Sequence, residues 1–193
     1  MIALVEAECC ALAGTDCRPT PLRRRAGRPQ LKRDPLASAA RRTVPITRIA
    51  LLEFLRSCRY AVQSSLHPSG APQSAVVGIA VSDTFEIVFD TLATSRKGQN
   101  LRRRTEIAFV IGSLEGKDER TVQFEGRADE PTGAERARLT ELYFGAFPDG
   151  RERQKWPGLT YIRATPTWLR YSDYNVDPPE IVELDAETLS KLR

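Results

Sequence analysis

The sequence is poor in the residues that metal sites and acid–base catalysis most often use. His67 is its one histidine in 193 residues, and three of its four cysteines lie within the first 17 positions. The adjacent pair Cys9 and Cys10 does not have zinc-site spacing, and a mixed site would lack histidine ligands. We therefore expect no metal site and no disulfide framework, which suits a protein of the reducing cytoplasm.

Long apolar runs are also missing. No stretch of about 18 consecutive apolar residues occurs, so we expect no membrane-spanning helix and no membrane partner. The hydrophobic fraction of 41% and the charged fraction of 28% are ordinary for a globular protein. The length of the chain suits a single domain with a substantial core.

The positive net charge belongs to one end of the chain. Residues 1–43 hold nine Lys/Arg and four Asp/Glu, a net charge of +5, whereas the remainder holds 20 and 21, a net charge of −1. We expect residues 1–43 to be an Arg-rich, disordered and dispensable leader, and residues 44–193 to be the folded domain. A nucleic-acid partner is not expected, because the folded part lacks a basic face with interleaved aromatic residues.

Helical spacing is clearest at two places. Residues 46–57 (ITRIALLEFLRS) place Ile49, Leu52 and Leu55 on one face, and Thr47 is the expected N-cap. Cys58 follows on the apolar side, as a small core residue rather than a nucleophile. A second helix is expected to begin at Thr132, with residues 132–135 as a capping box, and to end near residue 147.

The rest of the chain has the alternation and turn residues of short strands. Five or six such strands with few helices between them indicate a small, mainly β (α+β) barrel and not a doubly wound sheet. The segments with strand character, from which five or six strands are expected, are residues 61–67, 73–81, 85–91, 106–112, 120–128, 159–164 and 167–174. A last apolar piece lies at 180–184 and a turn, LEGKDE, at 114–119.

Hydroxyl and cationic side chains gather where a strand gives way to a predicted helix. In FDTLATSRKGQNLRRR, Thr91 closes the strand, and Ser95, Arg96 and Lys97 open the helix. A helix N-terminus presents unpaired N–H groups and about half a positive charge, and Arg adds a planar fork suited to phosphate oxygens. These residues favour an anion at this position, although a solvated helix start would carry similar residues.

The order of these segments resembles the pyridoxamine 5′-phosphate oxidase-like family of FMN-binding split β-barrels. The resemblance runs from about residue 48 to 174, and is sharpest at Asp90–Thr91, residues 95–97, Asn100–Leu101, Arg120 and Glu125–Gly126. It implies a six-stranded split β-barrel with flanking helices. It also implies a homodimer that binds FMN in two symmetric clefts between subunits.

Carried over position by position, the resemblance assigns a phosphate site and a ring site. Thr91, Ser95, Arg96 and Lys97 would hold the FMN phosphate. Residues 75–80 would run beside the isoalloxazine ring, with Val76 and Val77 as apolar cover. Thr121, which follows Arg120 where the family has Gln, would be a shorter donor to the cofactor.

The sequence departs from the pyridoxamine phosphate oxidases themselves where their substrate is held. Residues 75–80 carry no basic side chain, Tyr171 is followed by Ser172 instead of Trp, and the Arg-Leu-x-x-Arg tail is replaced by DPPEIVELDAETLSKLR. The cofactor phosphate site is thus matched and the pyridoxamine phosphate site is not. We do not expect synthesis of pyridoxal phosphate.

Several functions remain open from the sequence. One is an FMN-dependent oxidoreductase acting on a small molecule, with a nicotinamide cofactor or oxygen as second partner. Another is a non-catalytic flavin-binding sensor, carrier or storage protein. Deazaflavin F420 is an alternative cofactor, and haem a weaker one, since only His67 could ligate iron. No catalytic residue is assigned. Trp168 and Arg170, which share a strand face, are candidates to bind a planar or anionic substrate, and equally fit a barrel wall.

Overall fold

The structure is a computed structural model that describes residues 46–112 and 118–193. Its helices are α1 (Arg48–Ser57), α2 (Arg96–Arg103), α3 (Gly133–Ala146), α4 (Gly150–Arg153) and α5 (Ala186–Lys191). Its strands are β1 (Tyr60–Leu66), β2 (Pro72–Gly78), β3 (Ala80–Val81), β4 (Ile87–Leu92), β5 (Glu106–Gly112), β6 (Arg120–Asp129), β7 (Leu159–Asp173) and β8 (Glu180–Asp185). The leader at residues 1–43 and most of the turn at 114–119 lie outside the described residues.

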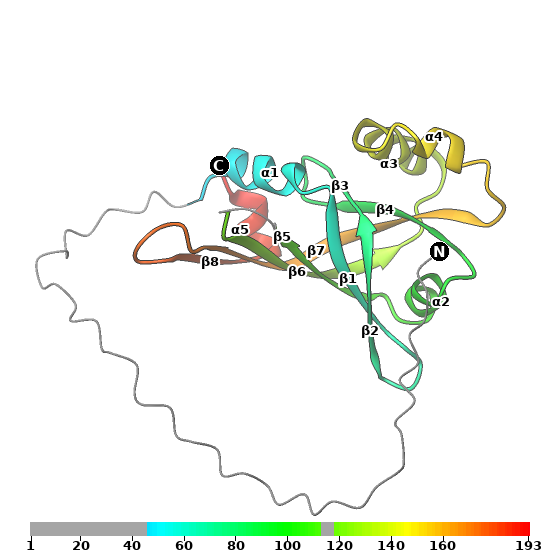
Figure 1. Ribbon diagram of the computed structural model, residues 1–193, viewed down its shortest axis with the longest axis horizontal. Helices are drawn as coiled ribbons and strands as arrows, with labels where there is room; N and C mark the ends of the chain where they lie inside the picture. The colour runs from blue at the N-terminus through cyan, green and yellow to red at the C-terminus, as the bar shows by residue number, and fades with distance from the viewer. Residues whose placement is uncertain (1–45, 113–117) are drawn as a thin grey trace, which may run out of the picture. The chain divides into compact units, whose positions relative to one another are not determined.

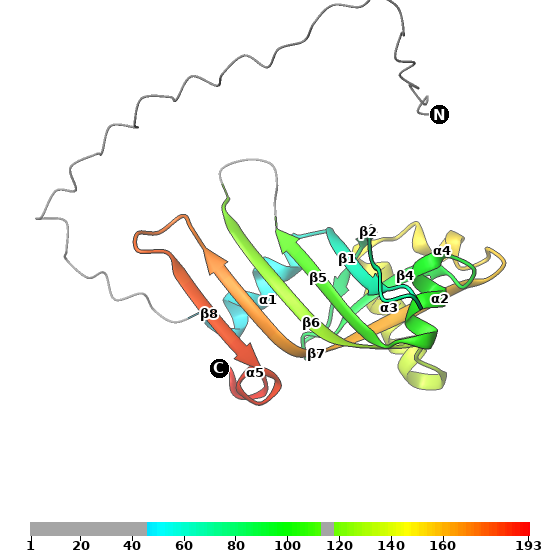
Figure 2. The same ribbon diagram turned by 90° about the horizontal axis from the view of Figure 1, so that it is seen from below.

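All strand pairs are antiparallel and belong to one sheet. The order is β2-β1-β5-β6-β7-β4-β3, and β8 adds to the free part of β7. Figure 2 shows β5, β6, β7 and β8 side by side, and Figure 1 shows β1 and β2 as a hairpin that reaches toward α2. The sheet curls into a half-barrel with helices on its flanks, so the split-barrel fold is confirmed. The expectation of six strands is wrong, because the described residues form eight.

Strand β7 differs from the expectation in the opposite direction, because it joins two predicted strands into one. Two strands were expected between residues 159 and 174, but β7 is continuous over fifteen residues. Pro166 lies opposite Gly126, and the register then shifts at a β-bulge, because Glu125 pairs with Trp168 and the intervening Thr167 of β7 has no partner on β6. A bulge leaves one residue out of the hydrogen-bonded ladder, so a proline without an N–H can lie inside a long strand. A Cβ added to Gly126 would come within 2.4 Å of the carbonyl oxygen of Thr165, so the bulge requires glycine.

The core fills the inside of the curl and the contact of α3 with the sheet. Phe109 lies between Phe89 and Phe124, with edge-to-face rings whose centroids are 5.9 and 5.5 Å away. A second cluster contains Leu139, Tyr143 and Phe144 of α3, packed on β3, β4 and β7. Strand β4 contributes side chains to both clusters. The position of the turn from β4 into α2 therefore depends on both.

Helix α1 begins where the sequence predicts. Thr47 is its N-cap, and its hydroxyl accepts a 3.2 Å hydrogen bond from the backbone N–H of Ala50. The predicted apolar face is partly wrong, because Ile49 is 68% exposed while Leu51 and Phe54 are buried. Cys58 packs at the edge of the core, and burial raises the pKa of its thiol. That environment does not favour the reactive thiolate.

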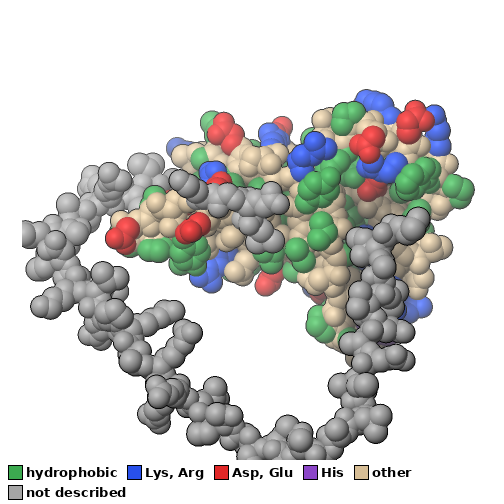
Figure 3. Space-filling model, viewed as in Figure 1, with side chains coloured by type: hydrophobic (Ala, Val, Ile, Leu, Met, Phe, Trp, Pro, Cys, Tyr) green, Lys and Arg blue, Asp and Glu red, His purple; other side chains and the backbone are tan. Residues whose placement is uncertain are grey.

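Helix α3 starts at the predicted place without the predicted capping box. Thr132 occupies the N-cap position, but its side chain makes no capping hydrogen bond. Gly133 has a φ of +56°. Glu135 pairs instead with Arg138 at 2.9 Å, one turn along the helix. The short helices α4 and α5 were not predicted. Acidic and basic side chains lie next to one another over α3 and α4, where Arg151 pairs with Glu141 (Figure 3).

None of the helices in residues 46–112 and 118–193 is long and apolar enough to cross a membrane. Across the same residues, no three His, Cys, Asp or Glu side chains are grouped so that they could hold a metal ion.

Candidate functional site

The start of α2 is built by short-range contacts that the sequence encodes directly. Ser95 is the N-cap, and its hydroxyl accepts a 3.1 Å hydrogen bond from the N–H of Gly98. The hydroxyl of Thr91, at the end of β4, lies 2.9 Å from that of Ser95. A Cβ on Gly98 would come within 2.8 Å of the carbonyl oxygen of Leu92, so glycine lets the helix start this close to the strand. Strand end and helix start thus form one rigid unit.

A cavity of about 360 Å³ opens beside this helix start. One wall comes from α2 and the other from the inner side and edge of the β1–β2 hairpin. Its lining residues are Gln63, Ser65, Gln73, Ser74, Ala75, Ser95, Arg96 and Lys97. Every one of these side chains except Ala75 is polar or positively charged, and none is acidic. The cavity is therefore suited to a polar ligand with an anionic group.

The two cations of this cavity are not neutralised by the rest of the described chain. No carboxylate in residues 46–112 or 118–193 forms an ion pair with Arg96 or Lys97. The nearest acid along the chain, Asp90, is held by Arg153 at 3.0 Å instead. The partial positive charge of the α2 N-terminus adds to both cations. An anion bound here would meet unopposed positive charge.

Gln63 provides a second, independent sign of a missing ligand. Its side chain is 0% exposed, and neither its amide nitrogen nor its amide oxygen has a hydrogen-bond partner among the described residues. Leaving a buried polar group unpaired costs about 1–3 kcal/mol, so such groups are rare in folded proteins. Because Gln63 lies in the cavity wall, a ligand with one acceptor and one donor would satisfy it.

Asn100 fixes the two walls relative to each other. This side chain of α2 is buried, and its Nδ2 donates to Ser65 Oγ at 3.2 Å and to Gln73 Oε1 at 2.9 Å. Ser65 and Gln73 are opposite one another in the β1–β2 ladder. One amide therefore holds both strands of the hairpin to the helix that carries the cationic side chains.

Strand β4 is held from its other side by α3 and α4. Tyr143 donates a 2.9 Å hydrogen bond to Asp90, and Arg153 donates to the other carboxylate oxygen at 3.0 Å. Burial, with the nearby charge of Asp90, raises the pKa of the Tyr143 hydroxyl well above its usual range. The phenol therefore stays protonated and acts as a donor. These bonds have a structural role: they fix Asp90, and with it the neighbouring Thr91 at the end of β4.

The other residues predicted to bind the cofactor lie outside this cavity wall. Val76 and Val77 point to opposite faces of β2, so that Val77 is buried in the core and Val76 is 70% exposed. Thr121 lies on β6, opposite Gly112 of β5. The structure brings together Thr91, Ser95, Arg96 and Lys97. It places Ala75, the first residue of the predicted ring strand, in the cavity wall and adds Gln73 and Ser74 of β2.

The candidates for substrate binding are also distant in the sheet order. Trp168 and Arg170 lie on β7, where they face Glu125 and Gln123 of β6. Neither lines the cavity at α2. Their role in binding a substrate stays a prediction, and within one chain they do not meet the phosphate site.

Four polar residues of the cavity wall were missed from the sequence: Gln63, Ser65, Gln73 and Ser74. A signal existed for the two on β1. Gln63 and Ser65 occupy alternate positions of β1, on the inward side shared with the buried Ala61. Polar residues at inward positions of a strand need partners. That pattern marks a polar cavity, but only the register shows which helix faces it.

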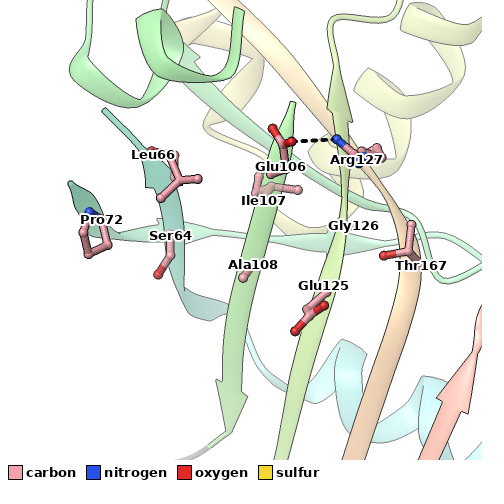
Figure 4. A pocket seen from close by; sticks show the side chains of 11 residues that line it. Ser64, Leu66, Pro72, Glu106, Ile107, Ala108, Glu125, Gly126, Arg127 and Thr167 are labelled. Atoms are coloured by element: carbon pink, nitrogen blue, oxygen red, sulfur yellow. Dashed lines mark ion pairs between the residues drawn. The ribbon is translucent and has the colours of Figure 1, made fainter. Parts of the chain in front are cut away.

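A separate hollow, distinct from the cavity at α2, lies on the sheet (Figure 4). It has a volume of about 340 Å³ and is lined by residues of β1, β2, β5, β6 and β7. Glu106 and Arg127 pair at 3.1 Å on its rim, and Leu66 and Ile107 form part of its apolar floor. Ser65 lines both hollows. The two are therefore neighbours across β1.

Comparison with known proteins identifies the family of this chain. The family model described as pyridoxamine 5′-phosphate oxidase matches residues 48–173, more than half of the chain. The chain belongs to the pyridoxamine 5′-phosphate oxidase-like family. The resemblance stated from the sequence is thereby confirmed. None of the curated proteins compared with the chain matches it.

Solved structures of this family's fold are similar at low sequence identity. A heme binding protein from Mycobacterium smegmatis has a TM-score of 0.66 and 14% identity, over 77% of this chain and 62% of its own. A protein from Clostridium acetobutylicum related to general stress protein 26 has a TM-score of 0.56 and 12% identity, over 74% and 96%. HutZ, a heme storage protein from Vibrio cholerae, has a TM-score of 0.54 and 11% identity, over 60% and 87%. This chain thus spans less than two thirds of the M. smegmatis protein, and the likeness is one of fold.

Proposed function

We propose that the chain binds FMN and uses it as an oxidoreductase acting on a small organic molecule. The observation that carries this proposal is the cavity in which two unneutralised cations at a helix N-terminus meet a buried amide without partners. Arg96, Lys97 and the hydroxyl of Ser95 suit the phosphate. Gln63 offers a donor and an acceptor, which suits the polar edge of a flavin ring.

The free edge of β2 supports the same placement of the ring. β2 ends the sheet order, so among the described strands only β1 pairs with its backbone. Backbone N–H and C=O groups near Ala75 are therefore available on the side away from β1. A bound flavin would supply the hydride and electron transfer, while these protein groups bind and orient it.

A homodimer is part of this proposal. Val76, Val62 and Val110 are neighbours across β2, β1 and β5, and all three are exposed. Adjacent exposed apolar side chains on a sheet commonly mark a protein contact. A two-fold contact through this stripe would bring a second copy against the face of β1 and β2 opposite the cavity wall, next to the free edge of β2. In such a dimer, Trp168 and Arg170 would contact a substrate bound at the flavin only if they reached the cavity from the second copy.

The experiment starts from the purified full chain. FMN titration followed by the visible spectrum tests binding, and anaerobic addition of NADPH or NADH tests reduction of the bound flavin. An oxidoreductase predicts saturable FMN binding and bleaching of the flavin absorption. Binding without bleaching by either nucleotide would leave a flavin sensor, carrier or storage protein. Absence of FMN binding would refute the proposal.

Titration of the same protein with two other cofactors distinguishes them from FMN. Deazaflavin F420 also carries a phosphate, so residues 95–97 do not distinguish it from FMN, and direct titration does. Haem is considered because two structural neighbours are described as heme proteins. The one histidine, His67, has its Nδ1 2.8 Å from Ser69 Oγ in the hairpin turn. A Soret band lost in His67→Ala would favour haem over FMN.

A further inference from the structure

A second polar cavity continues from the proposed phosphate site. It has a volume of about 310 Å³ and lies between the β1–β2 turn and the body of α2. Gln73 and Arg96 line both cavities. Along β2, Ala75 and Gln73 border the first cavity, and Gln73 and Ala71 border the second. The second cavity therefore extends beyond the phosphate site, away from the strand segment proposed to face the ring.

Positive charge converges on this second cavity from one face of α2. Arg96 and Arg103 are seven positions apart, which places them two turns apart on the same side of a helix. His67 contributes its ring from the hairpin turn opposite. No acidic residue lines the cavity, and no carboxylate of the described residues pairs with Arg103.

The neighbouring arginines of the same helix behave differently. Arg102 donates to Glu130 at 3.0 Å, so its charge is neutralised on the side away from the hairpin. Arg104 is the exposed C-cap residue and does not line the cavity. Arg103 is thus the one arginine of the Arg102–Arg104 run that lines the second cavity. Arg103 is the candidate ligand-binding residue because of its position in the cavity wall, and not because of the total charge of the run.

We propose that this second cavity binds a further anionic group of the same ligand, joined to the phosphate held at residues 95–97. The ligand is then of the diphosphate class, and the flavin of that class is flavin adenine dinucleotide. Arg96, which lines both cavities, has a planar fork that can contact both phosphates, and Arg103 contacts only the outer one. This inference rests on the proposed flavin site and narrows its ligand.

Calorimetric titration of the full chain tests this with four probes: inorganic phosphate, inorganic diphosphate, FMN and flavin adenine dinucleotide. We expect diphosphate to bind at least about 10-fold more tightly than phosphate, and the dinucleotide at least about 10-fold more tightly than FMN. Arg103→Ala should reduce both differences, because Arg96 alone then contacts the outer phosphate, and should leave phosphate and FMN affinity nearly unchanged. Arg104→Ala, which removes the same charge one residue away, should preserve them.

Each outcome decides a separate point. Equal effects of Arg103→Ala and Arg104→Ala, or equal affinities for FMN and the dinucleotide, would overturn the second anion site while leaving an FMN site in place. Failure of both flavins to bind would refute the proposed function, and the two inorganic probes would still decide the subsite. A diphosphate advantage that Arg103→Ala does not reduce would also overturn it, because the extra charge would then bind elsewhere.

Discussion

The hydroxyl of Tyr143 donates a 2.9 Å hydrogen bond to the carboxylate of Asp90, the residue before Thr91. This bond joins α3 to the strand that leads into the proposed phosphate site, and Arg153 of α4 completes it from the other carboxylate oxygen. The strand that leads into the proposed phosphate site is therefore supported by helices that do not line the cavity. Stability and ligand binding should be separable by mutation on the two sides of this strand.

Tyr143→Phe removes the phenol donor without changing the ring. We expect the free energy of unfolding to fall by about 1–2 kcal/mol, because Asp90 loses one hydrogen bond while Arg153 still pairs with it. Denaturant unfolding measures this change, and Tyr174→Phe, at an exposed tyrosine, is the matched control. Equal stability of the two variants would show that the bond to Asp90 contributes nothing.

Asn100→Ala separates α2 from the β1–β2 hairpin. The change removes the donor to Ser65 and Gln73, so we expect a loss of about 1–3 kcal/mol in stability and weaker FMN binding. Gln154→Ala, at an exposed position after α4, is the control and should change both quantities little. Unchanged FMN affinity in a folded Asn100→Ala variant would contradict its role in setting the distance between the walls.

Gln63→Met should shift stability and binding in opposite directions. Methionine has a similar shape and no polar atoms to leave unpaired, so the ligand-free variant should be as stable as the original or more stable, by up to about 1–3 kcal/mol. FMN affinity should fall by about 10-fold, because the ring loses a donor and an acceptor. Thermal unfolding with and without FMN measures both, beside Gln123→Met at an exposed position of β6. A less stable variant with full affinity would place Gln63 in a purely structural role.

Glu86 predicts a pH dependence of stability. Burial raises its pKa, but hydrogen bonds from Arg138 at 2.8 Å and from Ser82 and Thr84 outweigh this and hold the pKa below its ordinary value of 4.5. A lowered pKa adds stability above the unfolded value, and that stability is lost as the pH falls through the folded value. Glu86→Gln should therefore destabilise the protein at pH 7, and progressively less as the pH falls below the ordinary value of 4.5.

Urea unfolding of both proteins across that pH range measures the difference, with Glu53→Gln, at an exposed residue of α1, as the control. A difference between Glu86→Gln and the original protein that stays constant with pH would mean that the carboxylate charge is not involved.

The sequence predicted the features that depend on near neighbours. Ser95 is an N-cap because its hydroxyl reaches an N–H three residues on, and Thr47 caps α1 for the same local reason. The same reasoning failed at Thr132, where no side-chain cap forms before Gly133. The local sequence pattern therefore predicted where the helices start more reliably than it predicted the capping hydrogen bonds at those starts.

Features that depend on register could not be predicted in this way. Pro166 lies between the two predicted strands, but the bulge beside it at Thr167 is defined by pairing with β6, about 40 residues earlier in the chain. Gln63 was missed because its lack of a partner is a property of the fold and not of β1. The pairing of Ser65 and Gln73 with Asn100 likewise joins three separate elements.

The central claim is that the helix start at residues 95–97 binds the phosphate of a flavin. The most direct measurement is the ratio of FMN affinity to riboflavin affinity in the original protein and in Arg96→Ala/Lys97→Ala. The control Arg104→Ala/Lys191→Ala removes the same charge from exposed positions outside the cavity. We predict that the double change at 96 and 97 weakens FMN by about 2–5 kcal/mol, roughly 30-fold to several thousand-fold, and leaves riboflavin nearly unaffected. An unchanged ratio, or equal effects of the two double variants, would contradict the account.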